Sequence, residues 1–209
     1  MQELGRIEDG KIVEQDGMTI FIPWSGGYDS TLLLYENALE NPNELINAIT
    51  VLNLNNNDQE KAEAKARKQL KKQLKLPNIQ YHTIRIDYTN TPEEYQISRW
   101  FSTLIPVLDN GDELCMAYLG SDGVDFFALK PEFETAFNAF MDLRQIKCTL
   151  SFPFMYKTKG YVIKELKKAE LLKYVWTCGK PKKGKPCGKC MKCISIKRWT
   201  AYPDKGDRT

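Results

Sequence analysis

The chain has 209 residues, of which 42% are hydrophobic and 27% are charged, as is ordinary for a globular protein with one large domain. Its formal net charge of +3 is too small to indicate nucleic-acid binding by itself. No apolar run approaches the ~20 residues that a membrane-spanning helix needs, so the composition allows a core of useful size and argues against a membrane protein.

Strand-like and helix-like segments alternate after a polar lead-in, residues 1–18, which predicts turns or a small hairpin. Short apolar runs typical of buried strands lie at residues 19–24, 48–54, 81–86, 114–120 and 147–152. Helical patterns begin at Thr31, cover residues 58–74, 92–108 and 131–144, and run from Thr158 to about Tyr174. This alternation predicts an α/β fold with a doubly wound, parallel five-stranded sheet.

Several apolar and aromatic residues are predicted to form the core. The helix over residues 58–74 carries an apolar stripe with four-residue spacing, formed by Ala62, Ala66, Leu70 and Leu74. The other residues that we expect to pack in the core are Trp100, Phe101, Leu104, Ile105, Phe133 and Phe137. Cys115 and Cys148 are expected to be buried thiols, and His82 is expected to be a packed strand residue rather than a catalyst.

The segment SGGYDST, residues 25–31, lies between the first predicted strand and the first predicted helix. Its two glycines allow a tight turn that exposes successive main-chain N–H groups, and the helix adds the positive end of its dipole. Such a nest binds phosphate or pyrophosphate. The residues expected to hold the ATP phosphates, through main-chain amides and the hydroxyls of the serines and the threonine, are Trp24, Ser25, Gly26, Gly27, Asp29, Ser30, Thr31 and Leu32.

Asp29 is unusual beside phosphate unless a cation lies between them, so we expect Mg²⁺ to bridge Asp29 and ATP. Trp24 immediately precedes the loop and is expected to border the nucleotide. The alternative interpretation is a capped turn, with Asp29 or Ser30 as the N-cap of the helix. The segment is not a Walker loop, because it has neither that glycine spacing nor a loop lysine.

Four cysteines close to the C-terminus, Cys178, Cys187, Cys190 and Cys193, have a spacing that can surround one Zn²⁺ tetrahedrally. The alternative is two disulfides. The N-terminal residues MQELGRIEDG contain no apolar signal segment, so we expect the chain to remain in a reducing cytoplasm, where a structural zinc is favoured. The predicted organisation is therefore an ATP-binding α/β domain over residues 1–174 and a zinc-binding tail over residues 175–209.

Lysines crowd the cysteine segment, at positions 180, 182, 183, 185, 189 and 192, and Arg198 follows them. They have two interpretations. They attract phosphate or RNA, or they solvate an irregular loop and offset the charge of four thiolates. The composition alone leaves both open.

The loop SGGYDST resembles the SGGxDS loop of N-type ATP pyrophosphatases, and the C-terminal part resembles one member family, 7-cyano-7-deazaguanine synthase (QueC). The QueC resemblance rests on the segments Pro153–Ile163, Trp176–Cys178, Gly120–Asp125 with Pro131–Phe133, and the C-G-x-C-x-x-C finish of the cysteine run. The resemblance implies an adenine nucleotide alpha hydrolase-like fold and an ATP-dependent ligase that makes 7-cyano-7-deazaguanine from 7-carboxy-7-deazaguanine and ammonia, for queuosine-type nucleosides. It also implies that Lys159 reaches the phosphates or the acyl-adenylate, with Asp29 as the second catalytic residue.

The substrate-binding segment departs from the QueC pattern. The family's longer block between the positions of Asp125 and Pro131 is reduced here to Phe-Phe-Ala-Leu-Lys, so Lys130 is expected to replace an arginine. Asp122 and Asp125 are candidates to bind a guanine-like N–H edge, or are turn and cap residues. The family's Y-G-Q-R-H is replaced by residues 55–59. Two alternatives therefore stay open: a reaction that ends at the amide, and a different acid substrate.

Two other functions compete with this ligase. One is an enzyme that keeps the adenylating loop but acts on tRNA, and the other is a zinc-ribbon nucleic-acid binder that has lost catalysis. The intact loop argues against the second, so nucleic acid is not the expected partner. Homodimers are implied only by the family resemblance.

Overall fold

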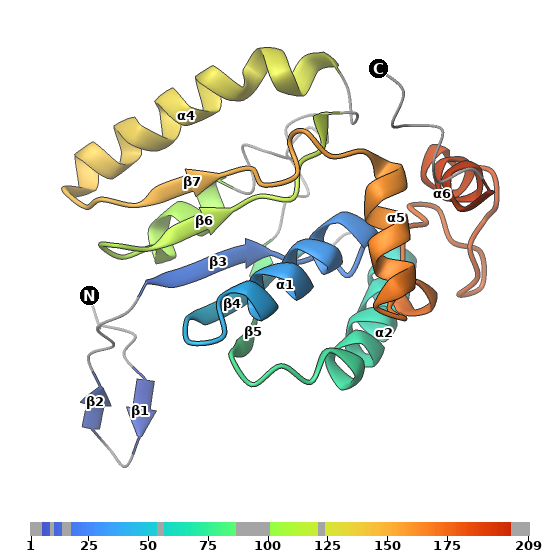
Figure 1. The fold of residues 1–209 in the computed structure, drawn as a ribbon, viewed down its shortest axis with the longest axis horizontal. Helices are drawn as coiled ribbons and strands as arrows, with labels where there is room; N and C mark the ends of the chain where they lie inside the picture. Colours follow the sequence, from blue (N-terminus) through green and yellow to red (C-terminus); the bar gives the residue numbers. More distant parts are fainter. Residues whose placement is uncertain are drawn as a thin grey trace.

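The computed structural model describes residues 6–8, 11–13, 18–53, 57–86, 101–120 and 124–201. A five-stranded sheet lies at its centre (Figure 1), in the order β5-β4-β3-β6-β7. The strands are β3 (Thr19–Pro23), β4 (Leu45–Asn53), β5 (Ile79–Ile86), β6 (Glu113–Cys115) and β7 (Thr149–Ser151). Every pairing is parallel, which confirms the predicted α/β fold and its five-stranded parallel sheet.

Strand order reverses next to β3, because the chain builds β4 and β5 on one side of it and then returns to place β6 on the other. Thr19 of β3 pairs with Leu45 of β4, and Ile20 pairs with Glu113 of β6. In open parallel sheets, ligands bind outside the carboxyl ends of the strands at such a switch point. The segments that follow β3 and β6 are therefore where a site is expected.

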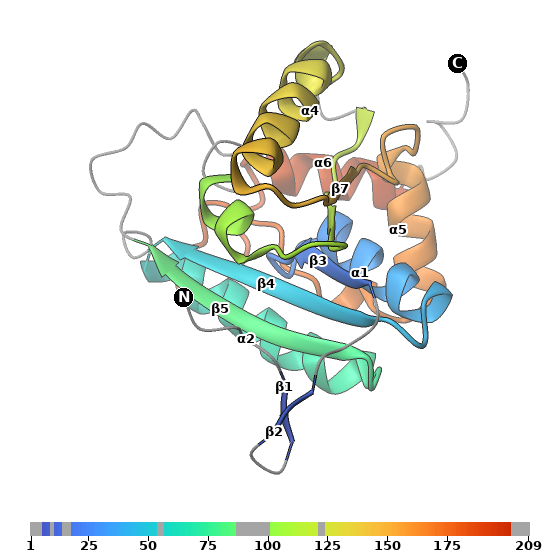
Figure 2. The same cartoon turned by 90° about the vertical axis from the view of Figure 1, so that its left-hand side faces the viewer.

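Helices cover both faces of the sheet (Figure 2), and alternate strand residues point to opposite faces. On one face, Ile20 and Ile22 pack with α1 (Tyr28–Glu40), α2 (Asn57–Leu74) and α5 (Lys159–Lys168). On the other face, Phe21 packs with residues 101–108, which include the 3₁₀ helix η1 (Ile105–Val107), and with α4 (Val124–Arg144). The core thus has two halves, one on each side of the strands.

Core predictions hold for most of the residues described. The stripe on α2 is buried at all four positions, Ala62, Ala66, Leu70 and Leu74. Phe101, Leu104, Ile105 and Phe137 are buried and Phe133 is partly buried, whereas Trp100 lies outside the described residues. Cys115 is also fully buried, and burial raises its pKa to about 12.

Two core predictions were wrong. His82 is exposed, because β5 is the edge strand of the sheet, and its Nε2 lies 2.7 Å from Oδ1 of Asn47. Cys148 is only half-buried, because it precedes the short edge strand β7, and its thiol donates to the carbonyl oxygen of Asp109. An edge strand leaves one flank open to solvent, which an apolar run does not reveal.

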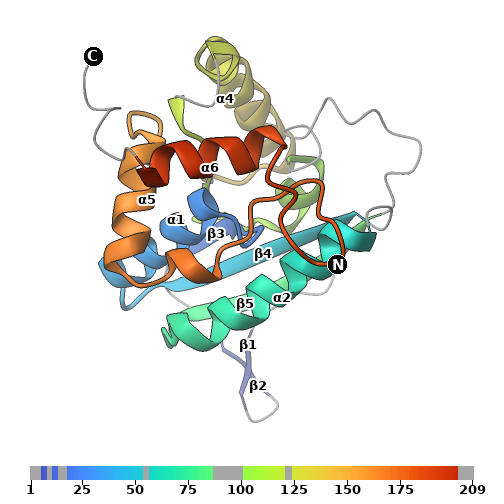
Figure 3. The same cartoon turned by 90° about the vertical axis from the view of Figure 1, so that its right-hand side faces the viewer.

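Helix boundaries differ from the predictions in three places. α4 begins at Val124 rather than at Pro131, so the proline lies inside the helix. α5 ends at Lys168, and the separate 3₁₀ helix η3 (Leu172–Tyr174) follows it. The tail contains α6 (Met191–Ala201), which was not predicted and which packs against α5 (Figure 3).

The N-terminal lead-in contains a two-stranded antiparallel hairpin of β1 (Arg6–Glu8) and β2 (Lys11–Val13), in which Arg6 pairs with Val13. This hairpin was one of the two predicted forms of the segment. Among the described residues, none of the helices combines the length and the apolar character required to cross a lipid bilayer.

Candidate functional site

The serine–glycine loop, residues 25–27, leaves the carboxyl end of β3 and leads directly into α1. Gly26 has a φ of +82°, a conformation that favours glycine. The Oγ atoms of Ser25 and Ser30 lie 3.1 Å apart, and Ser25 Oγ accepts from the N–H of Gly27 at 3.2 Å. The main chain of Ser25 in turn donates to Ser30 Oγ at 3.3 Å. The two hydroxyls therefore hold the turn in shape from within.

Trp24, Thr31 and Leu32 are buried beneath the loop. The indole N–H of Trp24 donates to Oγ1 of Thr31 at 3.1 Å, and the Trp24 carbonyl accepts from Oγ1 of Thr50 at 2.9 Å. Burial rules out the expected contact of the Trp24 ring with a nucleotide, and the Thr31 hydroxyl faces the core. These side chains pack beneath the loop and support it. Phosphate binding by their main-chain amides stays a prediction.

Arg67 supports the loop from α2 and was not found from the sequence. Its side chain is 8% exposed, and its Nη1 donates to the carbonyl oxygen of Ser25 at 3.1 Å. It forms ion pairs with Glu60 and Glu63, the second at 3.6 Å. A Cβ atom added to Gly26 would lie 2.8 Å from Cγ of Arg67, so this glycine is required by a close approach as well as by its φ. Burial is the main cause that raises the pKa of Glu63.

Asp29 and Lys159, the two predicted catalytic residues, meet at the mouth of the loop. Nζ of Lys159 lies 3.8 Å from Oδ2 of Asp29, and Oδ1 of that carboxylate is buried. Lys159 also donates to the hydroxyl of Tyr28 at 3.4 Å and lies 5.0 Å from the centroid of its ring. Both side chains remain partly exposed, at 24% for Asp29 and 16% for Lys159, so both can reach a bound molecule.

Lys159 is placed by the start of α5. The helix is capped by Thr158, whose side-chain oxygen accepts from the N–H of Tyr161 at 3.1 Å. Both α1 and α5 begin at the carboxyl edge of the sheet, so Asp29 and Lys159 lie in the first turns of neighbouring helices. The positive ends of two helix dipoles and one lysine create a positive region that suits a phosphate chain.

The structure does not test the three residues that were predicted to bind the substrate. Asp122 lies outside the described residues, and Asp125 belongs to α4 with its side chain undescribed. Lys130 forms an ion pair with Glu134 of the next helical turn, and its Nζ lies 5.8 Å from the ring centroid of Phe152. Its role as a substitute for arginine stays a prediction.

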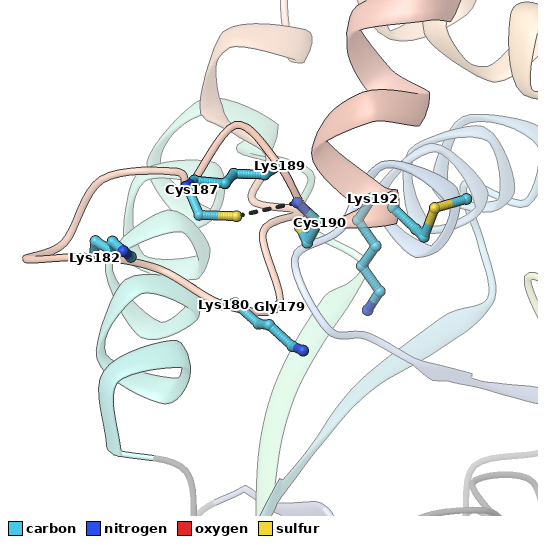
Figure 4. Close-up of a pocket in the computed structure, with 8 residues that line it drawn as sticks. Gly179, Lys180, Lys182, Cys187, Lys189, Cys190 and Lys192 are labelled. Carbon is cyan, nitrogen blue, oxygen red and sulfur yellow. Dashed lines mark hydrogen bonds between the residues drawn. The ribbon is translucent and has the colours of Figure 1, made fainter.

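The four tail cysteines form one cluster, in which all four Sγ atoms lie within 4.8 Å of one another. A tetrahedral Zn–S distance of ~2.3 Å requires sulfur atoms about 3.8 Å apart, so the cluster fits a zinc ion with small adjustments. Main-chain N–H groups point at the sulfur atoms. Cys187 donates to Cys178 at 3.2 Å and Cys190 donates to Cys187 at 3.3 Å, the dashed line in Figure 4.

The thiols of the cluster differ in acidity. The main-chain N–H of Cys193 is the largest cause that lowers the pKa of Cys190, to about 6, whereas burial is the largest cause that raises the pKa of Cys193, to about 12. Gly188 takes a φ of +72° in the turn between Cys187 and Cys190, as expected for a knuckle that presents two sulfur atoms to one ion. Four thiolate ligands would leave no open coordination position for chemistry.

An open cavity of about 590 Å³ lies against the cysteine cluster (Figure 4). Its lining residues are Gly179, Lys180, Lys182, Cys187, Lys189, Cys190, Met191 and Lys192. No acidic residue occurs in the sequence between Glu170 and Asp204, so the described part of the tail carries basic side chains and no acidic ones. The expected crowding of lysines is therefore present in space as well as in sequence.

Residues 109–205 match the model of the protein family described as "Queuosine biosynthesis protein QueC". The matched range begins just before β6 and includes α4, β7, α5 with Lys159, and all four cysteines of the tail. It does not include the serine–glycine loop. No curated protein matches the chain. This part of the chain is therefore similar to the QueC family, in agreement with the predicted resemblance.

Proposed function

Because the chain is QueC-like over residues 109–205, we propose that it is an ATP-dependent carbon–nitrogen ligase that converts 7-carboxy-7-deazaguanine and ammonia into 7-cyano-7-deazaguanine. The observation that carries this proposal is the approach of Lys159 to Asp29, 3.8 Å apart, beside the SGGYDS loop. The pair joins a loop outside the matched range to a lysine inside it. A polar loop, a cation and a carboxylate at a strand switch point suit the activation of an acid by ATP.

The chemistry requires two activations. In the first, a carboxylate oxygen attacks the α-phosphorus of ATP, and pyrophosphate leaves. Ammonia then attacks the acyl carbon, and AMP leaves with the former carboxylate oxygen, which gives the amide. In the second, the amide oxygen attacks the α-phosphorus of another ATP, and pyrophosphate leaves again. Loss of AMP with that oxygen and of two protons from nitrogen leaves the nitrile.

The loop and Lys159 have an electrostatic task in both activations. Pyrophosphate departs with developing negative charge, which the positive helix ends and the Lys159 ammonium stabilise at the mouth of the loop. Asp29 orients this ammonium and is the residue that would hold Mg²⁺, since its side chain is 24% exposed at the mouth of the loop. A bound Mg²⁺ would neutralise phosphate charge.

The zinc site has a structural role in this proposal. Four thiolates complete the coordination of the ion, so the zinc fixes the fold of the tail rather than taking part in the reaction. The tail lies next to the loop, because the N–H of Trp176 donates to the carbonyl oxygen of Gly26 at 3.0 Å. The enzyme is proposed to be cytoplasmic, and a homodimer is proposed from the family resemblance.

One alternative keeps the same loop and changes the outcome. The segment between Asp125 and Pro131 is short, and Lys130 is engaged by Glu134, so the enzyme would end at the 7-amido product or adenylate another substrate such as tRNA. A second alternative, a nucleic-acid binder, is favoured only by the basic tail around the cavity. It predicts binding that weakens steeply with salt.

The test is an incubation of the zinc-loaded protein with ATP, Mg²⁺, ammonia and 7-carboxy-7-deazaguanine, followed by mass spectrometry of the base and quantification of AMP and pyrophosphate. The nitrile with two AMP per product supports the ligase, and the amide with one AMP supports the shorter reaction. Absence of both products and of AMP, with nucleotide still bound, would refute a 7-deazaguanine substrate. The D29A variant is the control for background hydrolysis.

A further inference from the structure

Trp176 connects the cysteine cluster to the serine–glycine loop through two hydrogen bonds. Its main-chain N–H donates to the carbonyl oxygen of Gly26 at 3.0 Å. Its indole Nε1 donates to the carbonyl oxygen of Cys178, a residue of the cluster, at 2.9 Å. Its own carbonyl oxygen lies 3.7 Å from the position that a Cβ atom would take at Gly27. One residue therefore contacts both the loop and a cysteine of the cluster.

Arg67, which belongs to α2, contacts the same loop as Trp176. It donates to the carbonyl oxygen of Ser25, the residue before Gly26, and its stem lies against Gly26 itself. The loop carbonyls at positions 25 and 26 thus accept from Arg67 and Trp176 respectively. With both carbonyls fixed, the peptide planes of the loop have little freedom to rotate, and the orientation of its N–H groups is set.

A second connection returns from Arg67 to the tail. Arg67 pairs with Glu63 at 3.6 Å, and Glu63 accepts from Nε2 of Gln59 at 2.7 Å. Oε1 of Gln59 lies 4.0 Å from the Cβ position of Gly179, the residue after Cys178. Arg67 therefore leads, through Glu63 and Gln59, to the residue after Cys178, whereas Trp176 bonds to Cys178 itself.

We propose that Arg67 and Trp176 are positioning residues of the serine–glycine loop, and that Trp176 couples metal occupancy of the cysteine cluster to nucleotide binding. A metal on Cys178 fixes that residue's carbonyl oxygen, which holds the Trp176 indole and, with it, the main-chain donor to Gly26. Nucleotide bound to the loop amides restrains Gly26 and, through it, the tail. Such coupling is reciprocal, so each ligand strengthens the binding of the other by the same factor.

The inference rests on the proposed function, because it requires that the loop bind ATP. Its test therefore reads out metal retention rather than turnover. Zinc-loaded protein is mixed with an excess of a chromogenic chelator, and the rate of zinc release is measured with and without saturating Mg-ATP, in the absence of the acid substrate. Calorimetry on the same samples establishes whether nucleotide is bound.

The decisive variant is W176F, which removes the indole N–H and keeps an aromatic ring. The matched control is W199F on α6, half-buried and outside both hydrogen bonds. In the wild type, Mg-ATP is expected to slow zinc release by about fivefold or more, the range of a typical coupling. The ratio of the zinc-release rate without Mg-ATP to the rate with Mg-ATP is expected to fall towards one in W176F. In W199F this ratio keeps the wild-type value. A purely structural role would instead change both rates of W176F equally and preserve the ratio.

Three results would overturn the inference. If calorimetry shows bound nucleotide but zinc release from the wild type is unchanged, the coupling does not exist and the proposed function stands. If W176F retains the full ratio, Trp176 is not the connection. If no nucleotide binds to the zinc-loaded wild type, the proposed function fails and the coupling fails with it.

Arg67 is tested with a pair of variants. R67M keeps the apolar stem against Gly26 and loses the donor to Ser25, whereas R67K keeps a cation but loses the planar fork. We expect R67M to weaken Mg-ATP binding by about tenfold with unchanged zinc content, and R67K to recover part of this loss, since one hydrogen bond to a partly buried acceptor is at stake. Equal nucleotide affinity in all three proteins would remove Arg67 from the positioning of the loop.

Discussion

Nζ of Lys159 lies 3.8 Å from Oδ2 of Asp29, although the two residues are far apart in the sequence. The parallel sheet produces this approach. Each strand delivers the chain to the same edge, so α1 after β3 and α5 after β7 both begin there. The helices then pack side by side on one face of the sheet. The ion pair is therefore a direct consequence of the topology.

The first prediction concerns Lys159. We expect K159A to lower the rate of ATP-dependent turnover by about 10²–10³, the effect of removing one donor that stabilises transition-state charge. K157A is the matched control, because Lys157 lies two residues earlier, is exposed, and contacts the ring of Tyr161 at 4.6 Å. Steady-state pyrophosphate release measures both variants. A similar loss in K157A would point to helix stability rather than to chemistry.

The second prediction concerns Asp29. D29A is expected to abolish ATP turnover while its melting temperature remains close to that of the wild type, because the residue is partly exposed in the first turn of α1. Pyrophosphate release and thermal unfolding monitored by circular dichroism test the two parts. Retained turnover in D29A would remove this carboxylate from the proposed magnesium site.

The third prediction compares two glycines with positive φ. G26A introduces a Cβ atom 2.8 Å from Cγ of Arg67, whereas nothing lies within 4 Å of the corresponding position at Gly111, whose φ is +93°. Both variants carry the steric cost of a Cβ atom at a positive φ, about 1–2 kcal/mol. Only G26A also displaces Arg67, so only G26A is expected to weaken ATP binding, measured by calorimetry. Equal nucleotide affinity would show that the loop tolerates a shifted Arg67.

The fourth prediction concerns the cysteine cluster. C187S removes one of four ligands, so we expect loss of bound zinc and a lower melting temperature, since binding free energy of a structural metal is folding free energy. C148S is the control, because Cys148 lies outside the cluster. Elemental analysis and thermal unfolding provide the measurements. Wild-type zinc content in C187S would contradict a four-thiolate site.

The fifth prediction concerns pH. Burial raises the pKa of Asp112 from 3.8 to about 6, and its Oδ2 accepts from the N–H of Asp109 at 2.6 Å. The folded state holds the proton more tightly than the unfolded state, so between these two values the free energy of unfolding falls as the pH rises. D112N lacks this titration and should keep a flatter profile. Urea unfolding of both proteins from about pH 4 to about pH 7 makes the comparison, and parallel profiles would refute it.

Local patterns were sufficient to predict the sheet and the loop. Apolar runs bounded by turn residues located all five strands of the sheet, and the paired glycines after the first run located the turn that carries a positive φ at Gly26. The cysteine spacing predicted a cluster that the fold assembles. These signals are readable because neighbouring residues generate them.

Properties created by distant packing could not be predicted. Arg67 looks like a solvated residue of a charged helix, and only the fold places it under Ser25. Thr31 resembles a loop donor, yet its hydroxyl faces the indole of Trp24 in the core. His82 lies on an edge that the strand order defines. The helix α6 is short and has no clear amphipathic pattern, so the sequence did not predict it.

The contrast between the buried Cys115 and the tail cluster has a practical consequence for redox handling. Cys115 is inaccessible and its pKa is about 12, so it resists oxidation and alkylation. The four sulfur atoms of the tail, within 4.8 Å of one another, need only small movements to form disulfides once a metal is removed. Air exposure of chelator-treated protein would thus lock the tail in a crosslinked state that refuses zinc, and a reductant restores the thiols before any reconstitution.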